Sequence, residues 1–231
     1  MRSIEGNFPD VDRDRAVTTS LTHLAADIGE PVLRVWTPPR QLAFGRLDAT
    51  TDGYDRARRI AARHGYSPIE RRVGGSAVAY TGRMVAFAYA TPTASGREGI
   101  DRRYRDATET LLRAFRVVGA DVERGEPDDS FCPGDYSIQG DGKIAGIAQR
   151  VKRDCALVAG CVTVYAADEG ALTAVLDPVY SALGRPFAPE SVGSIATAGG
   201  PDNIDPVVEA LRTAFGADRT TTTIPAAELV E

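Results

Sequence analysis

Cys132 is the residue of this chain whose type and setting best suit covalent chemistry. Pro133 and Gly134 follow it directly, which predicts a bent and exposed loop. A loop cysteine near a cation has a lowered pKa, and its thiolate is a nucleophile. Cys161 lies instead in a run of apolar and β-branched residues, where cysteines are structural, and Cys155 at the edge of that run is ambiguous. The residues alone leave a structural role open for Cys132 as well.

Lysine is almost absent from this chain, because only Lys143 and Lys152 among its 27 basic residues are lysines. Arginine cannot imitate a compact, titratable ammonium, so these are positions where the exchange for arginine is chemically disfavoured. Lys143 begins the stretch 143–150, in which small residues alternate with isoleucines. A lysine there can bind a carbonyl or phosphoryl oxygen or hold a thiolate, although a surface lysine at a hairpin end gives the same pattern.

Two arginines and two glycines form a third candidate, with Arg71 and Arg72 preceding Gly74 and Gly75. Guanidinium groups bind anionic oxygens through paired hydrogen bonds, and glycines let backbone N–H groups approach a ligand closely. The same residues are also typical of a tight turn with solvated arginines. In isolation the segment indicates either a ligand-binding loop or an ordinary turn.

Several classes of site and of protein find no support in the sequence. His23 and His64 both fall on predicted helices, and neither a CxxC nor an HExxH pattern occurs, so no metal site is expected. A net charge of −5 argues against a nucleic-acid partner. No apolar run approaches a membrane span, and the charged residues 1–15 do not resemble a signal peptide. Three cysteines make no disulfide framework, so we expect a cytoplasmic protein without a membrane partner.

The elements that must position these residues are predicted from hydrophobic periodicity and turn residues. The predicted helices span residues 14–28, 55–64, 100–118, 170–183 and 206–215. The predicted strands span residues 32–36, 84–90, 120–122, 136–138, 143–148 and 156–165, with a hairpin turn at 140–142. Strands arrive in groups with long helices between some of them, which favours an α+β fold with a mixed β-sheet and flanking helices. We expect one domain over residues 1–217 and a flexible C-terminal tail over 218–231.

Taken in order, these segments resemble the biotin/lipoate protein ligase and acyltransferase family. Residues 71–78 are similar to its RR-x-GGG-AV loop, and residues 135–150 are similar to its signature G-K-K-I-x-G-x-A-Q-R. Trp36 with residues 44–46 resembles an early R-x-W element, and residues 180–195 resemble the C-terminal helix and loop of lipoyl members. Within the family, the pattern Phe-Cys-x-Gly-x-Tyr before the lysine resembles octanoyl and lipoyl transferases that use a cysteine nucleophile.

This resemblance implies the catalytic domain of that family and an acyltransferase that performs protein lipoylation. Cys132 would take an octanoyl or lipoyl group as a thioester beside Lys143 and pass it to a lysine of a lipoyl-domain protein. The acceptor would be a glycine cleavage H protein or the E2 subunit of a 2-oxoacid dehydrogenase, the donor another acylated protein, and no cofactor is required. The resemblance also implies substrate-binding roles for Arg71, Arg72, Gly74, Gly75, Ser76, Ala77, Gly146 and Ala148.

The sequence also departs from the family pattern, which keeps two alternatives open. Ser76 replaces the third glycine of the loop, and Tyr80 stands where ligases often carry histidine. These changes weaken, without removing, the alternative of a lipoate–protein ligase that uses ATP and Mg²⁺. A non-catalytic lipoyl-domain-binding homologue is the third possibility. If the hairpin closes at 140–142, Lys143 faces Ile138 or Gln139, and the chain must bend back for Lys143 to reach Cys132.

Overall fold

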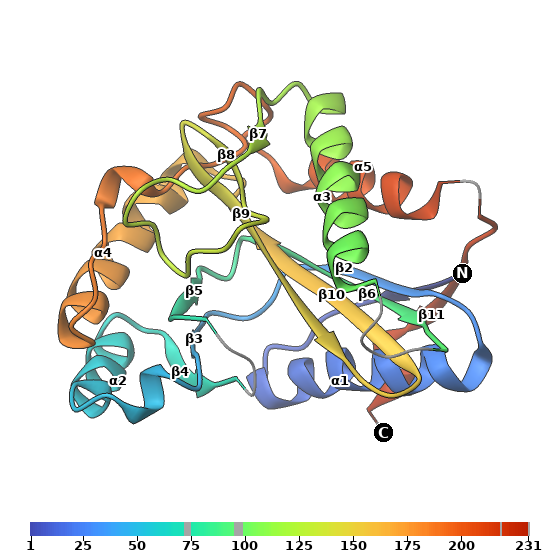
Figure 1. The fold of residues 1–231 in the computed structure, drawn as a ribbon, viewed down its shortest axis with the longest axis horizontal. Helices are drawn as coiled ribbons and strands as arrows, with labels where there is room; N and C mark the ends of the chain where they lie inside the picture. Colours follow the sequence, from blue (N-terminus) through green and yellow to red (C-terminus); the bar gives the residue numbers. More distant parts are fainter. Residues whose placement is uncertain (72–74, 95–98, 218, 231) are drawn as a thin grey trace.

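The computed structural model describes residues 1–71, 75–94, 99–217 and 219–230, which fold into a large and a small β-sheet with helices packed on both (Figure 1). The strands of the large sheet are, in spatial order, β11 (Thr222–Pro225), β1 (Arg2–Glu5), β2 (Val32–Trp36), β6 (Val85–Pro92), β10 (Cys155–Val162), β9 (Gly142–Val151), β8 (Ile138–Gly140) and β7 (Glu123–Arg124). Those of the small sheet are β4 (Ser67–Glu70), β3 (Gln41–Phe44) and β5 (Val78–Tyr80).

A mixed sheet is expected from the sequence, and the structure contains two separate sheets, both of them mixed. In the large sheet β1 runs parallel to β11 and β2, whereas β6, β10, β9 and β8 pair with their neighbours in antiparallel fashion. In the small sheet β3 is parallel to β4 and antiparallel to β5. The predicted hairpin joins β8 to β9, and Lys143 pairs with Gln139 beside a bulge. This pairing is one of the two that the turn position predicts.

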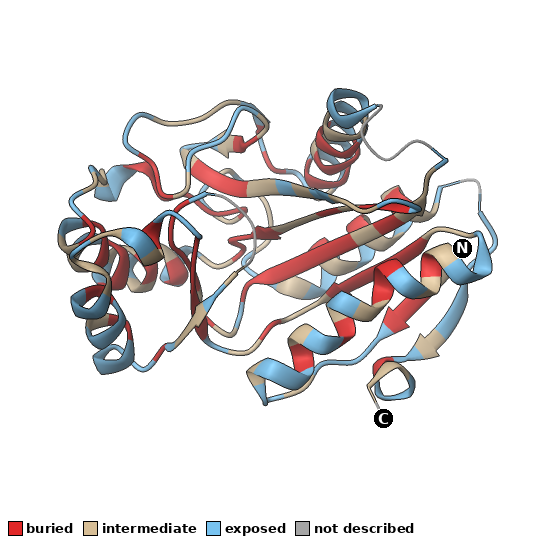
Figure 2. Ribbon diagram, turned by 60° about the horizontal axis from the view of Figure 1, so that its bottom comes forward, coloured by how far each residue is buried: buried red, intermediate tan, exposed pale blue. Residues whose placement is uncertain are grey.

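Helices cover both faces of the large sheet (Figures 1 and 2). α1 (Val11–Ile28) packs on one face, while α3 (Ile100–Val117) and α5 (Ile204–Gly216) pack on the other. Successive residues of a strand point to opposite faces. Phe87 of β6 therefore joins the core under α3 and α5, and Ala88 joins the core under α1. The apolar run 84–90 is accordingly a strand buried on both faces, as predicted.

A buried ion pair ties α1 to β2. Arg34 lies 2.6 Å from Asp14, and both side chains are almost inaccessible to solvent. Trp36 donates from its indole nitrogen to the other carboxylate oxygen of Asp14 at 2.9 Å. Burial lowers the pKa of Arg34, and the neighbouring carboxylate works in the opposite direction. The arginine and tryptophan of the R-x-W element thus hold α1 against the sheet.

The small sheet packs against α2 (Tyr54–Arg63) and α4 (Ala166–Ala182). Their shared core also contains Phe131 and Cys161, so it reaches from the small sheet to the β10 end of the large one. Three short 3₁₀ turns complete the fold: η1 (Asp48–Thr50), η2 (Pro189–Ser191) and η3 (Ala226–Leu229). The junction between the two sheets is the place where the candidate site forms.

Two predictions about the fold are wrong. Residues 222–225 are not a flexible tail, because they form β11 on the edge of β1. Their threonines and isoleucine suit a strand, but only the folded sheet offers the edge that they pair with. The strand expected at 120–122 starts later, at Glu123, because the N–H of Asp121 donates to the carbonyl oxygen of Ala198, which lies in a turn and not in a strand.

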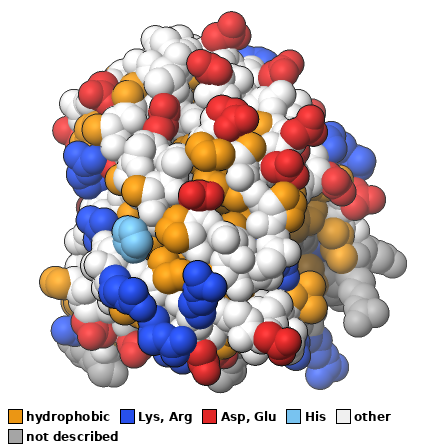
Figure 3. Space-filling model, turned by 90° about the vertical axis from the view of Figure 1, so that its left-hand side faces the viewer, with side chains coloured by type: hydrophobic (Ala, Val, Ile, Leu, Met, Phe, Trp, Pro, Cys, Tyr) orange, Lys and Arg blue, Asp and Glu red, His pale blue; other side chains and the backbone are white. Residues whose placement is uncertain are grey.

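Charge is unevenly distributed at the end of the molecule that carries α2 and α4. In Figure 3 basic side chains gather in the lower part of this face, at the level of α2, and acidic ones lie mostly above. The helix α2 contributes the exposed residues Arg56, Arg58, Arg59 and Arg63. None of the described helices is both long and apolar enough to cross a membrane.

Candidate active site

Cys132 lies in the loop between β7 and β8, and its backbone adopts an unusual conformation. Its φ is +45°, in the left-handed region that non-glycine residues seldom occupy. Its N–H donates to the hydroxyl of Tyr180 at 2.7 Å, and that hydroxyl donates to the carbonyl oxygen of Ala77 at 2.9 Å. Tyr180 of α4 therefore links the loop at residues 125–137, here called the cysteine loop, to the segment that enters β5. The cysteine itself is half-buried and free.

Arg71 supplies the cation beside the thiol. It follows β4, and its Nη2 lies 3.1 Å from the Sγ of Cys132 and also donates to the carbonyl oxygen of Ser76. Burial by itself lowers the pKa of Arg71, but the negative charge that Cys132 and Tyr80 can carry outweighs it and the net direction is upward. The guanidinium thus stays charged while it donates a hydrogen bond to the sulfur.

Lys143 meets Cys132 at its backbone and not at its sulfur. The lysine side chain is 1% exposed, and its Nζ donates to the carbonyl oxygens of Phe131 at 3.0 Å and of Cys132 at 2.9 Å. It also forms an ion pair with Glu126 at 2.7 Å. The chain does bend back after Cys132, as the predicted site requires. However, the hydrogen bond to the sulfur comes from Arg71, whereas the family resemblance implied that Lys143 holds the thiolate.

Gly75, which belongs to the segment 71–78 (the glycine loop), lies against the thiol and the Arg71 guanidinium. Gly75 has a φ of +87°, and a Cβ on it would lie 2.8 Å from the Sγ of Cys132 and 2.9 Å from Nη2 of Arg71. A side chain at this position would therefore displace the thiol or the guanidinium. Arg72 and Gly74, which were also predicted to bind substrate, lie outside the described residues.

Ser76 has its own partner, which explains how the loop accommodates a serine in place of glycine. Its hydroxyl accepts a hydrogen bond from Arg185 at 2.5 Å, and Arg185 in turn lies 3.2 Å from the buried Asp48. Burial raises the pKa of Asp48, while its bond to the N–H of Gly45 and the charge of Arg185 oppose the shift. The Ser76 side chain is thus fastened to the turn after β3.

A cavity of about 1110 Å³ adjoins Cys132 and Lys143. Along β9 and β10 its wall includes the cross-strand pairs Gly146–Cys161, Ala148–Ala159 and Arg150–Leu157. Small residues in the first two pairs keep the space beside these strands open. Four of the predicted substrate-binding residues, Arg71, Gly75, Gly146 and Ala148, line this space. Ala77 does not line it, because it is fully buried in the core of the small sheet.

Cys161 is a structural cysteine, as its apolar run predicted. Burial raises the pKa of its thiol to about 11, and a negative charge on Cys132 adds to the shift. Burial also raises the pKa of Cys155. At neutral pH both thiols are protonated, so neither competes with Cys132 as a nucleophile.

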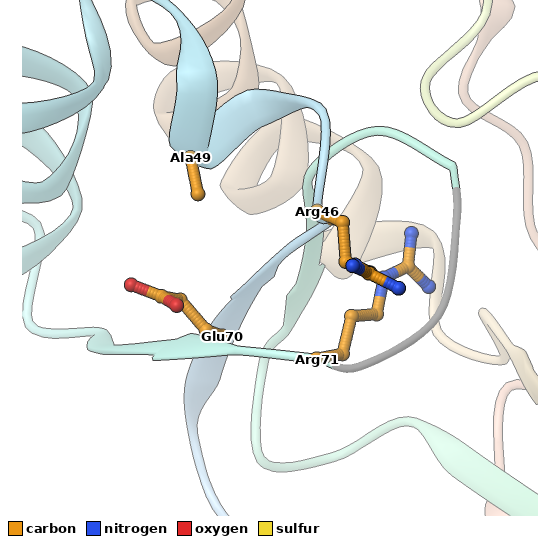
Figure 4. Close-up of a pocket in the computed structure, with 5 residues that line it drawn as sticks. Arg46, Ala49, Glu70 and Arg71 are labelled. Carbon is orange, nitrogen blue, oxygen red and sulfur yellow. The ribbon is translucent and has the colours of Figure 1, made fainter.

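A second, smaller pocket of about 500 Å³ opens beside the glycine loop. Figure 4 shows the guanidinium groups of Arg46 and Arg71 side by side on one wall, with Glu70 pointing away from them. Glu70 and Arg71 line both this pocket and the larger cavity, and Arg71 also touches the thiol. Within the described residues, no group of three His, Cys, Asp or Glu side chains is arranged to hold a metal ion.

Three residues of the site escaped the sequence analysis: Glu126, Tyr180 and Arg185. Glu126 stands in a polar segment that predicts only a loop, and Arg185 is one of many arginines. Tyr180 is 48 residues from Cys132 in the chain, and a tyrosine on the apolar face of a helix normally indicates packing. All three are identified only in the folded structure, where each contacts the cysteine loop or the glycine loop.

Curated relatives of this chain are acyltransferases by name. It is 28% identical over 147 residues to the octanoyl-[GcvH]:protein N-octanoyltransferase of Geobacillus kaustophilus, which covers 63% of this chain and 52% of the relative. It is 30% identical over 129 residues to the lipoyl-[GcvH]:protein N-lipoyltransferase of Listeria monocytogenes, covering 55% and 46%. The chain thus spans about half the length of the curated relatives it matches.

The fold is shared with lipoate protein ligases. The bipartite lipoate protein ligase of Thermoplasma acidophilum superposes with a TM-score of 0.73 at 20% identity, over 99% of this chain and 89% of that chain. The sequence of residues 14–216 matches the lipoyl protein ligase A/B catalytic domain. That match includes the cysteine loop, the glycine loop and Lys143, and we conclude that the chain belongs to the lipoyl protein ligase A/B catalytic domain family.

Proposed function

We propose that this protein transfers an octanoyl or lipoyl group to a lysine of a lipoyl-domain protein through a thioester on Cys132. The observation that carries the proposal is the 3.1 Å contact between Arg71 and the Cys132 sulfur at the edge of the large cavity. A thiol beside a permanent cation is a nucleophile, and the cavity next to it has space for an acyl chain. Burying that chain contributes about 0.8 kcal/mol for each methylene.

The transfer proceeds in two steps with one bond exchanged in each. In the first, the Cys132 thiolate attacks the acyl carbonyl carbon of the donor. The bond to the donor nitrogen breaks, and the leaving lysine amine takes the proton that the thiol released. In the second, the neutral amine of the acceptor lysine attacks the thioester and the carbon–sulfur bond breaks. The proton that the attacking nitrogen loses goes to the departing sulfur, which regenerates the Cys132 thiol. Arg71 stabilises the sulfur anion both as nucleophile and as leaving group.

The partners in this proposal are two lipoyl-type proteins in the cytoplasm. The names of the curated relatives specify octanoyl or lipoyl groups carried by GcvH, the glycine cleavage H protein. By analogy the donor here is an acylated H protein, and the acceptor is another lipoyl domain such as that of an E2 subunit. Neither step consumes ATP, because the energy of the donor amide bond is retained in the product amide. No cofactor is therefore needed.

Intact-mass spectrometry tests the proposal. The protein is incubated with octanoylated H protein without ATP, and we expect one acyl adduct, on Cys132. Cys132→Ala should lose both the adduct and the transfer to an acceptor. Cys155→Ala, which replaces a buried cysteine outside the lining of the cavity, should keep both. An adduct-free protein that acylates the acceptor only with free octanoate or lipoate and ATP would instead be a ligase. Binding of the acceptor without any turnover would identify a non-catalytic homologue.

A further inference from the structure

The loop that carries Cys132 is held in a conformation that it would not adopt alone. Asp129 and Cys132 are the two non-glycine residues with positive φ in the described parts of the chain, at +51° and +45°. Such backbone conformations are sparsely populated and persist only where the surrounding structure enforces them. A group that enforces them at a nucleophile sets the direction of the thiol.

Glu126 contacts the loop on both sides of the nucleophile. Its Oε1 accepts a hydrogen bond from the hydroxyl of Ser130, two residues before Cys132. Its Oε2 accepts from the N–H of Gly134, two residues after it, at 3.0 Å. Pro133 has no N–H to donate, so Gly134 is the first position after Cys132 that a carboxylate can hold by its backbone.

Glu126 also orients Lys143, which fixes the middle of the loop. The two oxygens of Glu126 lie 2.7 Å and 3.1 Å from Nζ, and the same ammonium donates to the carbonyl oxygens of Phe131 and Cys132. Charge-assisted hydrogen bonds of this kind are the strong ones. Between them, the carboxylate and the ammonium bind a polar group of Ser130, Phe131, Cys132 and Gly134 in turn.

We propose that Glu126 is a positioning residue for the acyl transfer inferred above: acting through Lys143, Ser130 and Gly134, it holds Cys132 in the left-handed conformation that presents the sulfur to Arg71 and the cavity. The reaction in this inference is the one given as the proposed function. The choice of Glu126 comes from the geometry of the loop. It also gives Lys143 its partner, because a buried ammonium without a counter-charge is costly.

Replacing Glu126 changes the net charge near the thiol, and this change affects the alkylation of Cys132. Replacing a residue that only supports the fold would not have this effect. The titratable and charged groups that face Cys132 are Arg71, Tyr80, Lys143, Cys161 and Tyr180, with Glu126 behind Lys143. Glu126→Gln keeps the shape of the side chain but leaves the ammonium of Lys143 without a counter-charge. The thiol is then more easily ionised while its backbone is less firmly held. Its reaction with a small alkylating agent and its reaction with an acyl donor should therefore change in opposite directions.

The experiment measures two rates of Cys132 in the full chain, in wild type and Glu126→Gln. One is thioester formation from saturating octanoylated H protein, and the other is alkylation by iodoacetamide between pH 6 and 9. For Glu126→Gln we expect thioester formation to fall about tenfold or more, since a charge-assisted hydrogen bond is lost. We expect its alkylation profile to move to lower pH. Glu123→Gln, which removes an exposed carboxylate that pairs with Gln139, is the matched control and should change neither rate.

A milder variant guards against loss of the fold. Ser130→Ala removes one contact of Glu126 and keeps its charge, so thioester formation should fall severalfold while the alkylation profile stays in place. Thioester formation within twofold of wild type in Glu126→Gln, or an alkylation profile that does not move, overturns the inference. Alkylation needs no acyl donor, so it tests Glu126 even if the wild type forms no thioester, a result that would refute the proposed function instead.

Discussion

Arg71 Nη2 lies 3.1 Å from the Sγ of Cys132, although the two residues are 61 positions apart in the chain. Arg71 follows the last strand residue of β4, and Cys132 sits in the loop before β8. The contact therefore joins the small sheet to the large one. It also means that any change in the packing of the two sheets alters the environment of the thiol.

Replacing Arg71 should remove the main stabilisation of the thiolate. A hydrogen bond to a charged group contributes about 1.5–3 kcal/mol, which corresponds to roughly a ten- to hundredfold change in rate. We expect Arg71→Ala to slow thioester formation by that factor and to slow alkylation of Cys132 at pH 7. Arg46→Ala, which removes the neighbouring exposed arginine of the small pocket, is the control. An Arg71→Ala protein with wild-type alkylation would contradict the role assigned to the guanidinium.

Gly75 should be intolerant of any side chain. A methyl group there would lie 2.8 Å from the thiol and 2.9 Å from the guanidinium, at a φ of +87°. We expect Gly75→Ala to reduce thioester formation at least tenfold, measured in a single turnover. Gly170→Ala is the matched control, because Gly170 lies in α4 and its added methyl would meet nothing within 4 Å. Alanine suits a helix better than glycine, so this control should be stabilised by about 0.5–1 kcal/mol. Equal activities of the two variants would show that the glycine loop does not confine the thiol.

The hydroxyl of Tyr180 should contribute to both the stability of the protein and the rate of thioester formation. Tyr180→Phe leaves the N–H of Cys132 and the carbonyl of Ala77 without their shared partner. Buried polar groups that lose a partner cost about 1–3 kcal/mol, so we expect a loss of stability of that size in urea unfolding, together with slower thioester formation. Tyr165→Phe, at the start of the same helix, controls for a lost phenol that does not touch the cysteine loop. If both variants unfold at the same urea concentration as wild type, the two hydrogen bonds of the Tyr180 hydroxyl contribute nothing to stability.

Cys161 should make stability depend on pH in the alkaline range. Its folded-state pKa is about 11, raised by burial from an ordinary value of 9.0. The folded protein therefore keeps this proton at a pH where the unfolded chain has lost it. The contribution of Cys161 to stability is complete below pH 9 and declines as the pH rises from about 9 to 11. We expect the urea midpoint of wild type to fall more steeply between about pH 9 and 11 than that of Cys161→Ala. Parallel declines would exclude this thiol as the cause.

The features that could be predicted from the sequence are those formed by residues close together in the chain. Apolar residues three and four apart placed α1 and α3, and the glycines at 140–142 placed the β8–β9 hairpin, because helices and tight turns form among neighbouring residues. The same locality made Cys132 recognisable as a loop cysteine. Its role as a nucleophile came from the family resemblance, and it stays a prediction until the thioester is observed.

Only the tertiary structure decided which groups meet the thiol. Periodicity says which face of an element is buried, but contacts between loops depend on how the two sheets pack. That packing put Arg71 on the sulfur, turned Lys143 toward the Cys132 carbonyl, and brought in Glu126 and Tyr180. It also gave residues 222–225 a strand edge to pair with. Hydrogen bonds between distant segments leave no periodic trace in a sequence, because each needs only one donor and one acceptor at the right place in space.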